Sequence, residues 1–170
     1  MIKRILVALP VAAAVAVLAG PGAFADTVST SDGPAASLDI TAAPGSFPVR
    51  TSGHWAEPDQ EVIVGYPQNV IKVQTEAGQG YVAALLRAPY NEPLHVGTYS
   101  TVGYAPDHPE LASVLLVHDG LGCYAEEGGF TVDRIETDPA TGFLTAFDGV
   151  FDQRCPGSTG TAHGEIHFRR

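Results

Sequence analysis

Two histidines and a glutamate near the C-terminal end of the chain have a spacing that suits metal ligands. His163, Glu165 and His167 follow one another in steps of two, so in an extended strand all three side chains project from the same face. Paired imidazoles with a carboxylate are ligands that zinc takes in proteins, and three ligands would leave an open coordination position. The same pattern is typical of a solvent-facing terminal strand with polar outward residues. The sequence therefore predicts a candidate metal site, with that polar strand as the alternative.

Acidic residues gather in three segments that are expected to be turns. Calcium takes six to eight oxygen ligands from such loops, yet the Asp-x-Asp-x-Asp-Gly spacing of a calcium-binding loop is absent. Solvation of the hairpins explains these residues better, and no bound zinc or calcium is expected. The acidic residues are Asp107 and Glu110 in one segment, Glu126 and Glu127 in the next, and Asp138 in the third.

Four aromatic residues lie in or beside expected loops, next to proline or glycine. They are Trp55, Tyr66, Tyr90 and Tyr104. Aromatic rings on the rim of a β-sandwich can stack on sugar rings or anchor a protein partner. Each ring can equally pack against its own loop, so the set is a candidate binding surface for a glycan or a protein.

The chain lacks the familiar signatures of nucleophilic catalysis. The turn Gly157-Ser158-Thr159-Gly160 does not have the Gly-x-Ser-x-Gly spacing, and no His-Glu-x-x-His motif is present. Adjacent pairs such as His118 and Asp119 diverge in an extended chain. We therefore expect a protein that is not an enzyme, although a triad assembled only in space leaves no trace in the sequence.

The elements that carry these residues are short strands. Runs of β-branched and aromatic residues alternate with Gly, Pro, Asn and Asp clusters, and no window shows a long helical period. Ten strands separated by short turns favour an antiparallel sandwich over a parallel sheet, which would need helical crossovers. The predicted strands are residues 38–42, 47–50, 62–65, 70–75, 81–87, 97–102, 112–118, 130–137, 143–153 and 164–168.

Local signals refine this class to a Greek-key β-sandwich, Ig-like or jelly-roll-like. Residues 138–142 place Pro and Gly where a hairpin loop needs them, and Asp119-Gly120 marks another turn. Leu94, Gly97 and Tyr99 match a tyrosine corner, in which the phenol bonds back to the backbone where the chain changes sheets. An ordinary half-buried strand tyrosine is the alternative.

The two cysteines are expected to form a disulfide inside the sandwich. Phe143, Phe147, Phe151 and Cys155 fall on one face of a single long strand, because alternate residues share a side. An exported chain enters an oxidising compartment, where Cys123 and Cys155 pair rather than stay reactive.

The N-terminus indicates export. Lys3 and Arg4 precede an apolar stretch, and Ala23-Phe24-Ala25 is a small-x-small cleavage site. The stretch is shorter than the roughly 20 residues of a membrane span. We predict a signal peptide at residues 1–25, a flexible leader at 26–36, whose polar composition cannot form a core, and a single domain at 37–170. The mature protein is expected to be soluble and extracellular.

The charge balance disfavours two classes of partner. The formal net charge is −10, and cleavage of the signal peptide with Lys3 and Arg4 takes it to −12. Nucleic-acid backbones and anionic membranes bind through clustered Lys and Arg, and Lys72 is the one lysine of the mature chain. Neither nucleic acid nor a membrane is expected as a partner.

The cysteine-containing half of the chain carries a series of short motifs. They are Gly122-Cys123, Gly129-Phe130-x-Val132, residues 138–142, Phe147-x-x-x-Phe151-x-x-x-Cys155 and Gly164-x-Ile166, with Pro93-Leu94 and Gly97-Thr98-Tyr99 upstream. In these motifs the chain resembles a module of secreted actinobacterial proteins that has no assigned activity. The resemblance implies an exported β-sandwich with one disulfide, and it brings no functional residue to this chain. Residues 42–53 depart from the module's usual aspartate and aromatic stretch around a Gly-rich turn.

These observations lead to one expected function and one alternative. The expected function is a secreted, non-enzymatic recognition or surface-associated module whose ligand is a glycan or a protein. The alternative is a metal-binding protein or metal-dependent enzyme that uses His163, Glu165 and His167.

Overall fold

A computed structural model describes residues 35–75, 80–102 and 108–170 of the chain. They belong to the larger of its two compact units, Asp32–Arg170. The predicted signal peptide and nearly all of the predicted leader lie outside the described residues, as do Tyr104 and Asp107. Within the described residues, no helix has the length and apolar character needed to span a membrane.

The described residues form eleven strands in two sheets. All strand pairs within both sheets are antiparallel. The six-stranded sheet has the order β2 (Gly53–Ala56), β1 (Ala36–Ala42), β11 (Ala162–Arg169), β10 (Leu144–Arg154), β9 (Glu127–Thr137) and β6 (Gly97–Val102). The five-stranded sheet has the order β3 (Val62–Gly65), β4 (Val70–Thr75), β5 (Val82–Arg87), β7 (Ser113–His118) and β8 (Leu121–Tyr124).

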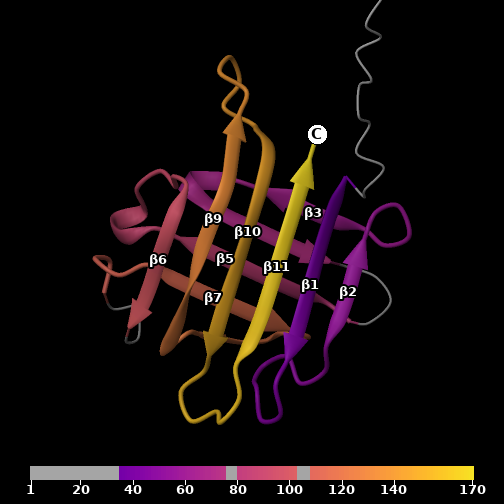
Figure 1. Ribbon diagram of the computed structural model, residues 1–170, viewed down its shortest axis with the longest axis vertical. Helices are drawn as coiled ribbons and strands as arrows, with labels where there is room; N and C mark the ends of the chain where they lie inside the picture. Colours follow the sequence, from indigo (N-terminus) through magenta and orange to yellow (C-terminus); the bar gives the residue numbers. More distant parts are fainter. Residues whose placement is uncertain (1–34, 76–79, 103–107) are drawn as a thin grey trace, which may run out of the picture. The chain divides into compact units, whose positions relative to one another are not determined.

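The sheets face one another, and the strands of the five-stranded sheet cross behind the other sheet at a steep angle (Figure 1). The chain changes sheets between β2 and β3, on both sides of β6, and between β8 and β9. The strand pairs β1–β11 and β6–β9 therefore join segments that are distant in sequence. The predicted class, an all-β antiparallel sandwich with one disulfide, is confirmed.

The core lies between the sheets and is built from alternate residues of each strand. Phe147 and Phe151 of β10 are buried beside Ile166 of β11, and β10 packs on β7 of the opposite sheet. Other large, fully buried side chains come from both sheets: Leu38, Ile40, Trp55, Ile71, Leu86 and Leu116.

The inward face of β10 begins one residue later than the sequence indicates. Phe147, Phe151 and Cys155 are buried as predicted. The prediction for Phe143 is wrong, since its side chain is 62% exposed. The pairing of β10 with β9 shifts register after Leu144, and such an irregularity moves neighbouring side chains to the opposite face. Leu144 is buried instead of Phe143.

Nine of the ten predicted strands are present, and the prediction for residues 47–50 is wrong. That segment is a loop in which the Ser46 hydroxyl donates a hydrogen bond to the Val49 carbonyl. Two strands are present that the sequence did not predict, β2 and β8. Both have only four residues and contain glycine, which weakens the β signal.

Both predicted turns and the tyrosine corner are confirmed. In the β9–β10 loop, the Asp138 carboxylate accepts hydrogen bonds from the backbone of Ala140 and Thr141. Asp119 and Gly120 both have positive φ between β7 and β8, as a two-residue hairpin turn requires. The Tyr99 hydroxyl bonds to the backbone N–H and carbonyl of His95, where the chain passes from β5 to β6.

The disulfide joins the two sheets. Cys123 lies in β8 of one sheet and Cys155 directly follows β10 of the other. The Gln153 side chain is fully buried, and its amide nitrogen lies 2.7 Å and 2.9 Å from the two sulfur atoms. The predicted pairing is confirmed, and it anchors the loop that starts at Cys155.

Candidate functional site

The three predicted metal ligands lie on the outer face of the six-stranded sheet. His163, Glu165 and His167 are exposed and alternate with the buried residues Gly164 and Ile166 along β11. The predicted orientation of the three side chains is therefore correct. The second histidine is four positions after the first, and a strand rises about 3.3 Å per residue, so their backbones lie about 13 Å apart.

Each imidazole is held by a carboxylate of the neighbouring strand β10. His163 Nδ1 lies 3.0 Å from Asp152 Oδ1, and His167 Nδ1 lies 2.9 Å from Asp148 Oδ1. His167 Nε2 also lies 3.5 Å from Glu165 Oε1. Among the residues that the structure describes, no group of three or more His, Cys, Asp or Glu side chains is arranged to hold a metal ion.

The acidic and imidazole side chains continue across the sheet to its edge. Asp39 of β1 is the register partner of Glu165, and His54 of β2 is the partner of Asp39. His54 Nδ1 lies 2.6 Å from Asp39 Oδ1. We call this surface the imidazole–carboxylate face; its members are Asp39, His54, Asp148, Asp152, His163, Glu165 and His167.

Asp148 is the most enclosed carboxylate of this face. Burial alone would raise the pKa of Asp148. The hydrogen bonds from Arg169 and His167, together with the positive charges of these two side chains, outweigh burial and hold the pKa of Asp148 below its usual value. Arg169 Nη1 also donates to the carbonyls of Phe147 and Phe168. Asp148 therefore remains ionised at neutral pH and orients the His167 ring.

Strand register also places a hydroxyl, an imidazole and a carboxylate in line. Ser37 of β1, His167 of β11 and Asp148 of β10 are successive register partners. The row has the composition of a catalytic triad. His167 Nε2, however, lies beside Glu165, and no hydrogen bond joins Ser37 to His167 among the described residues. A second row of the same kind is Thr41, His163 and Asp152.

The acidic side chains predicted to lie in turns are engaged in hydrogen bonds and ion pairs. Arg154 binds Glu127 with a distance of 2.6 Å, and Glu126 lies 4.0 Å from the same guanidinium. A backbone hydrogen bond at Glu110 and a hydrogen bond from His108 lower the pKa of Glu110. Hydrogen bonds from the backbone of Thr141 and Ala140 likewise lower the pKa of Asp138. Glu110 and Asp138 are therefore held within their own turns, whereas Glu126 and Glu127 contact Arg154 at the end of the neighbouring strand β10.

The four aromatic candidates do not form one surface. Trp55 is 2% exposed, so its prediction as a rim residue is wrong; it lies in β2 opposite Leu38 and packs in the core. Tyr66 is partly buried, its hydroxyl accepts a hydrogen bond from the Leu94 N–H, and burial raises its pKa. Tyr90 is 66% exposed. Tyr104 lies outside the described residues.

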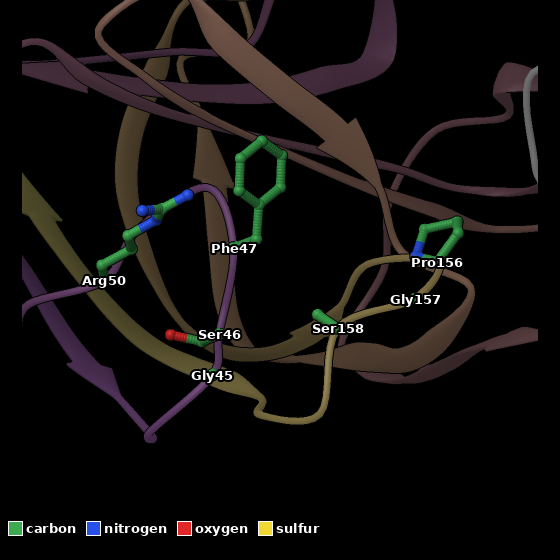
Figure 2. Close-up of a pocket in the computed structure, with 7 residues that line it drawn as sticks. All are labelled: Gly45, Ser46, Phe47, Arg50, Pro156, Gly157 and Ser158. Atoms are coloured by element: carbon green, nitrogen blue, oxygen red, sulfur yellow. The ribbon is translucent and has the colours of Figure 1, made fainter.

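The rim of the sandwich carries a pocket that the sequence did not indicate, shown in Figure 2. The β1–β2 loop forms one side and the β10–β11 loop the other, and the volume is about 450 Å³. Figure 2 shows the Phe47 ring standing between Arg50 and Pro156. We call this hollow the rim pocket; it is lined by Gly45, Ser46, Phe47, Arg50, Pro156, Gly157 and Ser158.

Phe47 and Arg50 give the rim pocket its chemistry. The Arg50 guanidinium lies 6.0 Å from the centroid of the Phe47 ring, within the range of a cation–π contact. Among the described residues, no carboxylate lies within ion-pair distance of Arg50. The Ser158 hydroxyl is bonded to the carbonyls of Cys155 and Gly160, which fixes the opposite loop.

Some functional residues could have been found in the sequence and others could not. Asp148 and Asp152 alternate with the phenylalanines of β10, so their outward direction follows from the period of two. Their contacts with the histidines depend on strand register. The rim pocket brings together loops that are about 100 residues apart. No protein family, no curated protein and no solved structure matches the chain.

Proposed function

We propose that the protein is an exported, non-enzymatic recognition module and that the rim pocket binds a glycan that carries a carboxylate. One observation carries this proposal: an aromatic ring, Phe47, stands in the pocket wall beside a guanidinium, Arg50, that has no carboxylate partner among the described residues. The disulfide at Cys155 holds the opposite wall in place.

The two side chains suit the two parts of such a ligand. The C–H groups of a sugar ring form an apolar face that can stack on Phe47. A guanidinium binds a carboxylate through two parallel hydrogen bonds. The net charge of −10 repels an acidic polymer at long range, but at physiological salt this repulsion is screened beyond about 8 Å. The cation inside the pocket therefore decides the preference at contact distance.

A polysaccharide-binding assay tests the proposal. The mature protein, expected to begin at Asp26, is run through native gels that contain polygalacturonate or neutral amylose. We expect polygalacturonate to retard it. Phe47→Ala and Arg50→Gln should each weaken the retardation at least fivefold, because each removes one of the two contacts.

Matched controls separate the pocket from general effects. Tyr90→Ala removes an exposed aromatic ring outside the pocket, and Lys72→Gln removes a cation on the other sheet. Both should bind like the wild type. If neither polysaccharide retards the protein, or if both pocket variants bind like the wild type, the glycan proposal fails. Trp55→Ala is unsuitable as a probe, since that residue belongs to the core.

Export and maturation are part of the same proposal. A disulfide between two sheets fits an oxidising compartment, and the N-terminal charged and apolar segments fit a signal peptide. Expression in a secreting host should release a protein whose intact mass corresponds to residues 26–170 with one disulfide. Retention in the cytoplasm with an intact N-terminus would contradict export.

A metal-binding function is the second candidate, and one observation favours it. Metal-bound histidines commonly bond to a carboxylate through their second nitrogen, and His163 and His167 both have Nδ1 beside an aspartate. Because the histidines are about 13 Å apart, we expect separate weak sites rather than one shared ion. Zinc titration at neutral pH should then give no high-affinity step, and one tight stoichiometric step lost in His167→Ala would favour the metal function instead.

A further inference from the structure

Among the residues that the structure describes, two large exposed apolar side chains meet in one groove. Phe143 is 62% exposed and Ile63 is 43% exposed, and both line a hollow of about 570 Å³. A second hollow of about 420 Å³ shares Tyr66, Phe143 and Leu144 with the first. Leaving large apolar groups in water is unfavourable, and a soluble protein that gathers them in one place commonly uses them for binding.

The groove lies between the two sheets; it shares no lining residue with the rim pocket, and it borders the imidazole–carboxylate face where Arg169 contacts Asp148. One wall is β3, the edge strand of the five-stranded sheet. The other is formed by the start of β10 and the end of β11, which Figure 1 shows at the same end of the six-stranded sheet. Phe168 of β11 packs against the core and continues the apolar surface inward.

The charged residues of the groove favour an anionic ligand group. They are Glu57, Arg169 and Arg170, and the ion pair of Arg169 with Asp148 leaves Arg170 as the cation that can bind a ligand. Arg169 is held by Asp148. The Arg170 guanidinium lies 6.0 Å from the centroid of the Phe143 ring, and no carboxylate of the described residues pairs with it. A cation therefore stands directly beside Phe143, the more exposed of the two apolar side chains in the groove.

We infer that this groove binds a free fatty acid, with the alkyl chain along Ile63, Phe143 and Leu144 and the carboxylate at Arg170. The alkyl chain would cover the two exposed apolar side chains, and the guanidinium would bind the head group through paired hydrogen bonds. The fatty-acid site is independent of the glycan site proposed at the rim pocket, because the groove and the rim pocket share no lining residue.

The length of the alkyl chain gives a quantitative test. Each methylene group that leaves water contributes about 0.8 kcal/mol, which is about a fourfold gain in affinity. Isothermal titration of the full mature protein with octanoate, decanoate and dodecanoate should therefore show affinity rising up to about 15-fold with each two-carbon step. A flat series would overturn the inference, since it would mean that the chain stays in water.

Variants assign the binding to the groove. Phe143→Ser should lower the affinity for dodecanoate at least tenfold, and because the side chain is exposed the fold should persist. Arg170→Gln should lower the affinity for dodecanoate but leave that for dodecanol unchanged. The matched control is Leu121→Ser, since Leu121 is 58% exposed and does not line the groove; it should bind like the wild type.

Three further outcomes would overturn the inference. The first is equal weakening of dodecanoate binding by Phe143→Ser and Leu121→Ser, which would show unspecific adsorption. The second is equal affinity for dodecanoate and for the cation dodecyltrimethylammonium, which would show that Arg170 does not bind the head group. The third is a dimer in sedimentation that Phe143→Ser converts to a monomer, because a second copy of the chain would then occupy the groove.

Discussion

The carboxylate of Asp148 on β10 lies 2.5 Å from the guanidinium of Arg169 on β11. The other carboxylate oxygen, Oδ1, lies 2.9 Å from Nδ1 of the His167 imidazole. Its side chain is only 19% exposed, so this small network joins the two central strands of the sheet at the border of the imidazole–carboxylate face. The contacts with Arg169 and His167 lower the pKa of Asp148 despite its burial.

The lowered pKa predicts how Asp148 contributes to stability at different pH values. A carboxyl whose pKa is lower in the folded state stabilises the fold above the unfolded pKa of about 3.9, and this contribution disappears as the pH falls through the folded pKa. Asp148→Asn should therefore reduce the free energy of unfolding by about 1–2 kcal/mol at pH 7. Below about pH 4 the difference from the wild type should shrink.

Urea unfolding at pH 7 and pH 3 measures this difference. Asp133→Asn is the matched control, because Asp133 is an exposed aspartate of the adjacent strand β9; its stability should stay close to that of the wild type at both pH values. A deficit of Asp148→Asn that is equally large at pH 3 would mean that the side chain acts through packing rather than through its charge.

Reduction of the disulfide should destabilise the protein strongly. The bridge spans 32 residues of sequence and joins the two sheets, so in the chain-entropy model it contributes about 3–4 kcal/mol. The melting temperature should fall when a reducing agent is added, and the Cys155→Ala variant should melt low with or without that agent. A wild type that melts at the same temperature in both conditions would contradict a stabilising bridge.

The tyrosine corner predicts a smaller effect. Tyr99→Phe removes the hydroxyl that bonds to the backbone N–H and carbonyl of His95 but keeps the ring stacked on Phe130. We expect a loss of about 1–2 kcal/mol in the free energy of unfolding, measured in urea. Tyr90→Phe, at an exposed position, should change it by less than about 0.5 kcal/mol. Similar values for both variants would show that the corner contributes nothing.

The sequence predicts best those features that depend on a local period. The bounds of β3, β4 and β6 match the predictions because each of these segments is a short run rich in β-branched residues. The sequence does not predict strand β2 and wrongly predicts Trp55 on the rim, because four residues that begin with a glycine carry too weak a β signal. The exposure of Phe143 depends on a register shift of β10, which no period in the sequence shows.

The candidate sites depend on pairings between distant segments. The outward direction of His163 and His167 follows from the sequence alone, but their aspartate partners follow only from the register of β10 with β11. Phe47 and Arg50 meet Ser158 in one pocket because β1 pairs with β11, which brings the ends of the domain together. Such long-range register is set by the whole core.

Gly164 lies directly opposite Phe151 in the pairing of β11 with β10, and this contact leaves no room for a side chain. A Cβ atom at Gly164 would come within 2.1 Å of the Phe151 ring. Gly164→Ala should therefore lower the free energy of unfolding by about 1–3 kcal/mol, because the ring or the strand must move. Gly65→Ala is the matched control, since a Cβ there meets nothing closer than 3.7 Å.

A second substitution shows whether the phenylalanine ring causes the destabilisation by Gly164→Ala. Phe151→Leu removes the ring edge, so the double variant Gly164→Ala/Phe151→Leu should lose less stability than the sum of the two single losses, by about 0.5 kcal/mol or more. Urea unfolding of the four proteins measures this coupling. Strictly additive losses would mean that the glycine is needed for its backbone freedom rather than for the space that Phe151 fills.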